Sequence, residues 1–395
     1  MGTPVAPAFI RGTTITDDLV TFGPANGDLC FRAPDPGSLV PCLPLRNPRL
    51  LADLHVLAFD EIVSYLNEVG RRLGLSDNRH LQEALENSLR LADMTAPLLE
   101  ASFEQLPCLF AADAVREIAD ATIGIPYLEG WVERSMSDGR VASVRAMGAR
   151  ALHIVAGNSP LISALSIIRN AIVRSDAIIK TPSNDPFTAL AIARTMAEAA
   201  PDHPITRHLS VAYWKGGDQA IEDHLYRPAV IEKIIAWGGF ASVKHVTRYI
   251  QPGLELISLD PKRSATIIGS EAFTSKERLS EAARLAATDI GALNQLGCVN
   301  ARVIYVVGKV EDVNELGEAI YAELQRLPPH VSTPAKRFDP ELKASVEALR
   351  SSPDWYRVYG GSDGEGAVIV SKLDEPVEFH GSLSGRTANL VPITA

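Results

Sequence analysis

The sequence predicts an α/β protein built from two consecutive blocks of parallel-sheet architecture. From about Arg150 onward, strand-like apolar runs alternate with helical patterns, which is typical of βαβ units around a parallel sheet. The chain has 395 residues, which corresponds to two or three domains at roughly 100–200 residues each. We expect a cleft between two such blocks to be the ligand site.

The composition, with 46% hydrophobic and 22% charged residues, is that of an ordinary α/β protein, and it excludes collagen-like, low-complexity and disordered chains. A net charge of −10 without runs of Lys and Arg argues against a nucleic-acid partner. Four cysteines without CxxC spacing predict neither a disulfide scaffold nor a metal site. No apolar stretch of about 18 residues and no signal-peptide pattern occurs, so we expect a cytoplasmic protein without a membrane span.

The first 148 residues predict a hairpin followed by helices. Residues Ala8 to Pro34 are rich in β-branched and aromatic side chains interrupted by glycines, which favours a short antiparallel hairpin. From Asp53 to about Glu133, apolar residues recur at helical spacing with charged residues between them. This pattern predicts amphipathic helices that pack against a larger body.

The first α/β block is expected over residues 149–257. A strand ending near Ala156 leads into a helix that Ser159 can cap and Pro160 can begin. The same cap-then-proline pair, Asp185 and Pro186, predicts the next helix after the strand Ala177–Lys180. Further strands are expected at Leu209–Trp214, Lys233–Trp237 and Leu254–Asp260, and a short helix at Ala241–Tyr249.

The second α/β block is expected over residues 258–375, followed by a return strand within residues 376–395. It contains predicted strands at Ala265–Gly269, Ala301–Val307, Ala367–Val370 and Ala388–Ile393, and helices at about Lys276–Asp289, Val313–Arg326 and Glu341–Arg350.

Cys298 is a candidate nucleophile because it lies in a turn between a helical pattern and a strongly apolar strand. A cysteine at such a turn can be partly exposed, and its thiolate can attack an acyl carbon. The alternative is a small buried hydrophobic residue, which is the commoner role of a lone cysteine.

Other candidates follow the strands of the first block. Asn158 could donate a hydrogen bond to an oxyanion or could simply form a turn. Lys180 ends a strand, where it could meet a ligand or water. Gly238 and Gly239 precede a helix and would allow a diphosphate to approach the backbone, although they lack the full GxGxxG pattern.

Taken in order, four segments resemble the conserved blocks of the aldehyde dehydrogenase superfamily. Within it, the sequence is most similar to the acyl-CoA reductases, a group that includes the long-chain fatty acyl-CoA reductase of bacterial bioluminescence. The resemblance covers about residues 150 to 393. The segments are Ile154-Val155-Ala156-Gly157-Asn158-Ser159-Pro160, Ile178-Ile179-Lys180-Thr181-Pro182-Ser183, Ala236-Trp237-Gly238-Gly239, and Asn294-Gln295-Leu296-Gly297-Cys298 with Arg302.

The resemblance implies an aldehyde-dehydrogenase-like fold, with a Rossmann-type cofactor domain at residues 149–257 and a catalytic domain at residues 258–375. Cys298 would be the nucleophile, and Asn158 with the Cys298 amide would form the oxyanion hole. Lys180 would hold the adenosine ribose, and Gly238 and Gly239 would border the pyrophosphate. The family also implies a homo-oligomer, with an arm made from the N-terminal hairpin and the strand near Ala388.

Departures from the family pattern refine these expectations. Ser183 stands where many oxidising members have a ribose-binding Glu, which favours NADPH, with NADH still possible. Ser258 aligns with the Glu that activates hydrolytic water, so a thioacyl enzyme would react with a thiol rather than with water. Ser382 aligns with a Glu that holds the nicotinamide ribose. Family members continue beyond the point where this sequence stops, so we expect either a shortened form or another chain that supplies this part.

The expected reaction is therefore NADPH-dependent reduction of a fatty acyl-CoA to the aldehyde through a thioacyl group on Cys298. The partners would be acyl-CoA and an acyl-donating enzyme. Two alternatives stay open, namely a reductase of another activated acyl group such as an acyl phosphate, and a non-catalytic homologue that binds nucleotide.

Overall fold

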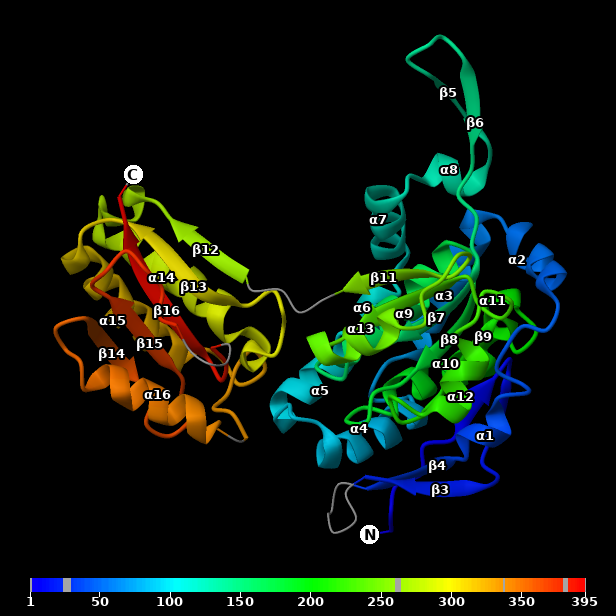
Figure 1. The fold of residues 1–395 in the computed structure, drawn as a ribbon, viewed down its shortest axis with the longest axis horizontal. Coiled ribbons are helices and arrows are strands. Elements are labelled where there is room, and N and C mark those ends of the chain that lie inside the picture. The colour runs from blue at the N-terminus through cyan, green and yellow to red at the C-terminus, as the bar shows by residue number, and fades with distance from the viewer. Residues whose placement is uncertain (1, 24–29, 260–263, 337, 379–382, 395) are drawn as a thin grey trace. The chain divides into compact units, whose positions relative to one another are not determined.

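The computed structural model describes residues 2–23, 30–259, 264–336, 338–378 and 383–394. The chain divides into two compact units (Figure 1). The first comprises residues 1–92 and 102–260, and the second comprises residues 93–101 and 261–395. Each has an α/β architecture of its own, in agreement with the predicted fold class.

A seven-stranded sheet forms the centre of the first unit, in the order β11-β10-β7-β8-β9-β1-β2. Its five parallel strands bring their carboxyl ends to one edge, which is where open α/β sheets bind ligands. They are β7 (Arg150–Ile154), β8 (Asp176–Lys180), β9 (Leu209–Ala212), β10 (Lys233–Trp237) and β11 (Glu255–Leu259). The antiparallel strands β1 (Ala8–Ile10) and β2 (Thr13–Ile15) complete the sheet beyond β9.

Helices cover both faces of this sheet. α12 (Gln219–Leu225) and α13 (Phe240–Thr247) pack on one face, over a core that includes Leu152, Ile178 and Ala236. α9 (Pro160–Ile172) and α10 (Thr188–Ala199) pack against each other, and α9 faces the side chains of alternate residues of β7, β10 and β11 on the other side.

The predicted N-terminal helices are confirmed, and their apolar faces pack against α9 and α10. The principal ones are α3 (Phe59–Arg72), α4 (Arg79–Leu91) and α7 (Ala112–Thr122). Shorter helices are α1 (Pro36–Leu39), η1 (Pro48–Leu51), α2 (Ala52–His55), α5 (Ala96–Glu104), α6 (Leu106–Leu109), α8 (Ile125–Glu129) and α11 (Pro204–Arg207).

The second unit contains a five-stranded sheet in the order β12-β13-β16-β15-β14. In this order, the strands are β12 (Ser264–Ile268), β13 (Ala301–Val307), β16 (Thr387–Ile393), β15 (Ala367–Ser371) and β14 (Tyr356–Gly360). The first four are parallel, and β14 is antiparallel to β15. One face packs against α14 (Lys276–Gly291) and α15 (Val310–Arg326), and the other against α16 (Pro340–Arg350). The short helices are η2 (Ser270–Phe273) and η3 (Ala292–Gln295).

The expected arm made from the N-terminal hairpin and the strand near Ala388 is wrong. β1 lies between β9 and β2, and β16 lies between β13 and β15, so the backbone groups of each strand are already paired on both sides. The hairpin region instead forms two antiparallel pairs, since β3 (Leu19–Phe22) pairs with β4 (Phe31–Pro34).

A projecting hairpin replaces the end of the predicted helical region. β5 (Val132–Ser135) pairs with β6 (Val141–Val144), and the pair extends away from the helices of its unit (Figure 1). Gly139 turns the chain with a φ of +83°, a conformation that glycine adopts without strain. The helical pattern therefore ends before Glu133, where it was expected to end.

Candidate active site

The turn after β7 carries Asn158, half-buried, just before α9. The hydroxyl of Ser159 accepts a hydrogen bond from the Leu161 N–H at 3.3 Å, which confirms the predicted cap. Asn184, from the turn after β8, donates to the Gly157 carbonyl at 3.0 Å. A Cβ at Gly157 would lie 1.6 Å from the Asn184 side chain, so a larger residue at position 157 would displace the Asn184 side chain.

Asn184 is a site residue that sequence analysis missed. It belongs to the turn that follows the next strand, and only the fold brings it to Gly157. The predicted start of the following helix is also wrong, because α10 begins at Thr188 rather than at Pro186. Phe187 is therefore the N-cap, and the Asp185 carboxylate accepts hydrogen bonds from both the N–H and the hydroxyl of Thr188, the first residue of the helix, at 3.1 and 2.8 Å.

Lys180 ends β8 with a buried ammonium group on the face that packs against α12 and α13. Its Nζ lies 5.8 Å from the ring centre of Tyr213 and 5.5 Å from that of Trp214, distances at which a cation is attracted to an aromatic face. Burial lowers the pKa of Lys180 to about 8, although the negative charge of Glu222 opposes this shift. Ser183, three residues on, is exposed in a turn and carries no charge.

Glu222 in α12 is a second residue that sequence analysis missed. It is 1% exposed, and its carboxylate accepts hydrogen bonds from the Gly217 N–H at 3.1 Å and from Nε2 of His245 at 2.6 Å. The hydroxyl of Tyr249 donates to the same carboxylate at 3.4 Å. A buried, hydrogen-bonded carboxylate therefore supplies the negative charge that opposes the lowering of the Lys180 pKa.

Gly238 and Gly239 connect β10 to α13. The Gly239 carbonyl accepts from the Ser242 N–H at 3.0 Å, so Gly239 begins the helix. A Cβ at Gly238 would lie 3.3 Å from Ser242, whereas nothing among the described residues lies within 4 Å of a Cβ built at Gly239. The backbone at Gly239 is therefore open to approach from outside.

Ser258 is exposed near the end of β11, at the edge of the same sheet. It pairs laterally with Ala236, which pairs with Ile154 and through it with Lys180. Residues paired laterally in a parallel sheet point to the same face, so Ser258 and Lys180 share one face. Ser382 lies outside the described residues.

Cys298 is exposed in the second unit, in the turn between η3 and β13. The three residues Leu293, Asn294 and Gln295 have φ values of 52°, 53° and 61°, and this left-handed conformation is unfavourable for residues with a Cβ. The surrounding structure must therefore hold this loop.

Buried side-chain amides hold the loop at both ends. Gln295 donates to the carbonyls of Ala301 and Thr387 at 2.9 and 2.8 Å and accepts from the Thr387 N–H at 2.9 Å. Asn300 donates to the Asp289 and Ala292 carbonyls at 3.1 and 2.9 Å and accepts from the Gly297 N–H at 3.0 Å.

Arg302 and Asn294 add further bonds to the loop. The Arg302 guanidinium donates to the carbonyls of Gln295, Gly297 and Asn300 at 3.0 to 3.4 Å. The Asn294 side chain accepts from the Thr333 N–H at 2.7 Å. The loop that ends at Cys298 is thus fixed from the strands and turns around it, while Cys298 itself faces outward.

Five of the predicted site residues lie at or just after the carboxyl ends of strands in the first unit, namely Asn158, Lys180, Ser183, Gly238 and Gly239. Cys298 lies in the second unit. In the part of the chain that the structure describes, no group of three His, Cys, Asp or Glu side chains could hold a metal ion. The described helices include none that is long and apolar enough to cross a membrane.

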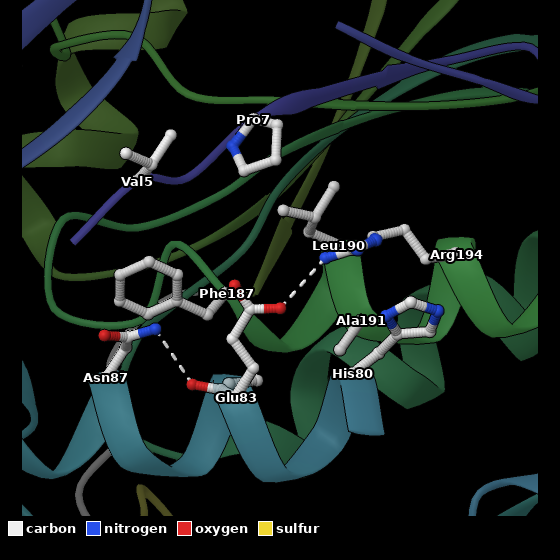
Figure 2. Close-up of a pocket in the computed structure, with 10 residues that line it drawn as sticks. Val5, Pro7, His80, Glu83, Asn87, Phe187, Leu190, Ala191 and Arg194 are labelled. Carbon is white, nitrogen blue, oxygen red and sulfur yellow. Dashed lines mark hydrogen bonds and ion pairs between the residues drawn. The ribbon is translucent and has the colours of Figure 1, made fainter. Parts of the chain in front are cut away.

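A hollow between α4, α10 and the N-terminal segment does not provide a ligand site. Figure 2 shows Glu83 and Arg194 on its wall, joined by an ion pair at 3.1 Å. Its volume is about 10 Å³, and a cavity needs roughly 10–15 Å³ to hold a single water molecule. We therefore treat it as a packing defect.

Comparison with known proteins places the chain in a family. The acyl-CoA reductase (LuxC) family profile matches residues 54–352. A long-chain acyl-protein thioester reductase from Aliivibrio fischeri is 27% identical over 320 residues, which are 80% of this chain and 64% of that protein. The corresponding protein from Photobacterium phosphoreum is 27% identical over 323 residues, again 80% of this chain and 63% of the relative. The chain thus spans somewhat less than two thirds of the length of these two relatives.

Solved structures establish the fold. An NADP-dependent glyceraldehyde-3-phosphate dehydrogenase from Bacillus halodurans superposes with a TM-score of 0.71 at 12% identity, over all of this chain and 82% of that one. An NAD-dependent benzaldehyde dehydrogenase from Corynebacterium glutamicum gives a TM-score of 0.70 at 14% identity, over 99% and 84% of the two chains. The chain therefore has the aldehyde dehydrogenase fold and belongs to the acyl-CoA reductase (LuxC) family.

Proposed function

We propose that this chain reduces an acyl thioester to the aldehyde, with Cys298 as the nucleophile and a nicotinamide dinucleotide as the reductant. The observation that carries the proposal is the exposed Cys298 at the end of a strained loop held by Gln295, Asn300 and Arg302. A reactive side chain on a fixed support is what covalent catalysis requires. In this proposal, residues 258–375 supply the nucleophile and residues 149–257 hold the cofactor.

The carboxyl edge of the first sheet is suited to the cofactor. Open space beside Gly239 lets a pyrophosphate approach the backbone. Lys180 provides a cation on the sheet face that packs against α12 and α13. The exposed Ser183 provides a hydroxyl group without negative charge. The missing negative charge supports NADPH as the preferred cofactor. When bound, the nicotinamide supplies the hydride that converts a thioacyl group into an aldehyde.

The residues of the chain would act in sequence. The Cys298 thiolate attacks the acyl carbonyl, a new C–S bond forms, and the C–S bond to the donor breaks so that the donor leaves as a thiolate, which takes a proton from water. Asn158 donates a hydrogen bond to the oxygen that carries the negative charge in this step, which is the kind of contact that typically contributes roughly 10²–10³ in rate. After reduction, the Cys298–carbon bond breaks, the aldehyde is released, and the Cys298 thiolate is regenerated.

The acyl donor is either coenzyme A or a protein. The matching relatives are named as reductases of acyl-protein thioesters, whereas the family is named for acyl-CoA. Both donors present the same thioester carbon to Cys298, so the mechanism is common to both. Ser258 supports transfer to a thiol rather than to water, because its hydroxyl is a far weaker general base than a carboxylate.

The test is incubation of the chain with NADPH and tetradecanoyl thioesters of coenzyme A and of a carrier protein. Loss of NADPH absorbance, free thiol and aldehyde are measured together with the intact mass of the protein. We expect an acyl adduct without cofactor and aldehyde with it, and neither in Cys298→Ser. Cys108→Ser, which removes another exposed cysteine, is the matched control and should behave as the native chain.

The outcomes separate the alternatives. An acyl adduct retained in Cys298→Ser would remove Cys298 from the mechanism. Reduction of an acyl phosphate without release of a thiol would favour another activated acyl group as substrate. Cofactor binding without adduct or aldehyde from any donor would identify a non-catalytic homologue.

A further inference from the structure

An apolar cavity of about 370 Å³ lies between α9 and the sheet of the first unit. Its walls include Ala151 from β7, Ile235 and Trp237 from β10, Ile257 and Leu259 from β11, and Val173 just after α9. Cavities that bind small molecules typically measure about 300–1,000 Å³ and are lined mainly by apolar side chains with a few polar groups. The size and lining of this cavity both fit that description.

The cavity lies on the opposite face of the sheet from Lys180. Lateral pairing places Lys180, Ile154 and Ala236 on the face that packs against α12 and α13. Because strand side chains alternate between faces, Trp237 points the other way, into the cavity. Cofactor and cavity occupant would therefore use opposite faces of one sheet and meet at the carboxyl ends of its strands, where Asn158 also lies.

The interior of the cavity is uncharged. His153, 6% exposed, lies within hydrogen-bonding distance of the Asn170 side chain at 3.2 Å, and Asn170 donates to the Ser175 carbonyl at 2.8 Å. Burial lowers the pKa of His153 to about 4, so the ring is neutral near pH 7. The lining also includes two cations: Arg169, which is exposed and whose guanidinium carbon lies 5.9 Å from the ring centre of Trp237, and Lys233, which forms an ion pair with Glu255.

We propose that this cavity holds the aliphatic tail of the acyl group, with the thioester end directed toward the carboxyl ends of β7 and β10. The inference rests on the proposed function and adds to it a site that selects long, unbranched chains. A neutral, apolar interior attracts such a tail through burial of its surface, and each added CH₂ group should strengthen binding about fourfold until the cavity is full.

Three polar atoms in the lining define the competing occupant. Oγ of Ser166, Nδ1 of His153 and Nε1 of Trp237 are buried without a hydrogen-bond partner among the described residues, and an aliphatic tail would leave all three as they are. A polar ligand, such as a hydroxylated chain or an amide, would instead bond to them. Replacing Ser166 by Ala therefore distinguishes the two kinds of occupant.

The experiment measures binding of a fluorescent conjugated-polyene fatty acid to the full chain, without cofactor, and its displacement by straight-chain fatty acids of increasing length. We expect displacement to tighten about fourfold per CH₂ over several steps and then to level off. Ile257→Asp, which introduces a charge at a position 45% exposed, should weaken binding at least tenfold. Ile267→Asp, the same change at a position 73% exposed on β12, should leave binding unchanged.

Ser166→Ala should bind the probe as tightly as the native chain or more tightly, and weaker binding would overturn the aliphatic assignment in favour of a polar occupant. Displacement that does not depend on chain length, or unchanged binding in Ile257→Asp, would remove the cavity as the tail site. The titration uses neither cofactor nor Cys298. Probe binding that depends on Ile257 in a chain without reductase activity would therefore leave the cavity standing while the proposed function fails.

Discussion

The ammonium group of Lys180 is the clearest case of a residue whose position weakens the fold. Burial lowers its pKa to about 8. Below that pH the folded chain therefore carries a buried positive charge, which is unfavourable, whereas the same charge is hydrated in the unfolded chain. The first prediction is that Lys180→Met raises the free energy of unfolding at pH 7 by up to about 3 kcal/mol and weakens cofactor binding.

The effect of Lys180 on stability depends on pH. Between pH 8 and the unperturbed pKa of 10.5, the unfolded chain binds more protons than the folded one, so the native chain gains stability as the pH rises. The advantage of Lys180→Met should therefore shrink over this range in urea unfolding at pH 7, 9 and 10. The exposed Lys215→Met is the control. A stability difference that does not change with pH would show that Lys180 is not the titrating group.

Ser183 supports the second prediction. A carboxylate introduced by Ser183→Glu would repel the 2′-phosphate of NADPH, and in a partly desolvated site we expect this repulsion to weaken NADPH binding about tenfold relative to NADH. Fluorescence titration with both cofactors measures the ratio. Ser270→Glu, at an exposed position in the second unit, should change neither affinity. Equal losses for the two cofactors in Ser183→Glu would place Ser183 away from the ribose.

The loop before Cys298 depends on contacts that sequence alone does not reveal. Gln295 belongs to a recognisable motif, yet its bonds reach Thr387, 92 positions later. The third prediction is that Gln295→Met lowers the free energy of unfolding by about 3 kcal/mol or more, because buried backbone groups that lose a partner each cost about 1–3 kcal/mol.

The same Gln295→Met change should slow acylation of Cys298 more than it slows general alkylation by iodoacetamide, since only acylation requires the loop in one conformation. Gln325→Met removes a single exposed hydrogen bond to the Glu365 carbonyl and should change stability by less than about 0.5 kcal/mol. If both variants have the same stability and acylation rate, the bonds of Gln295 do not hold the loop.

The local sequence pattern was sufficient to predict several of the helices and strands next to the site residues. β10 and β13 begin and end where the apolar runs predicted them, and Ser159 caps α9 as expected. β14 was missed because Tyr356–Gly360 is a short run at the sheet edge with a charged residue inside it. The turn contacts of Asn184 and the carboxylate of Glu222 were missed for a different reason, since both depend on distant segments meeting.

Two buried groups of the first unit, Asp176 and His153, should affect the stability of the chain in different ranges of acidic pH. Asp176 lies beside Arg11 and His208. Its pKa falls below the ordinary value, because hydrogen bonds from these two residues outweigh the opposing effect of burial. The stability it contributes is present above its unfolded pKa and is lost only as the pH falls through the folded value, below about 3.8. His153 should respond at a higher pH.

His153 carries the last prediction. Its pKa is about 4 in the folded chain against 6.5 when unperturbed, so between these values the unfolded chain binds the extra proton and stability falls with falling pH. We expect the free energy of unfolding to lose up to about 3 kcal/mol between pH 7 and pH 4 through this group. His153→Gln should be less stable at pH 7 but lack this loss, and the exposed His330→Gln should retain it. Comparing variants cancels other titrations, such as that of Asp185, whose pKa burial raises. An equally steep loss in His153→Gln would place the acid-sensitive group elsewhere.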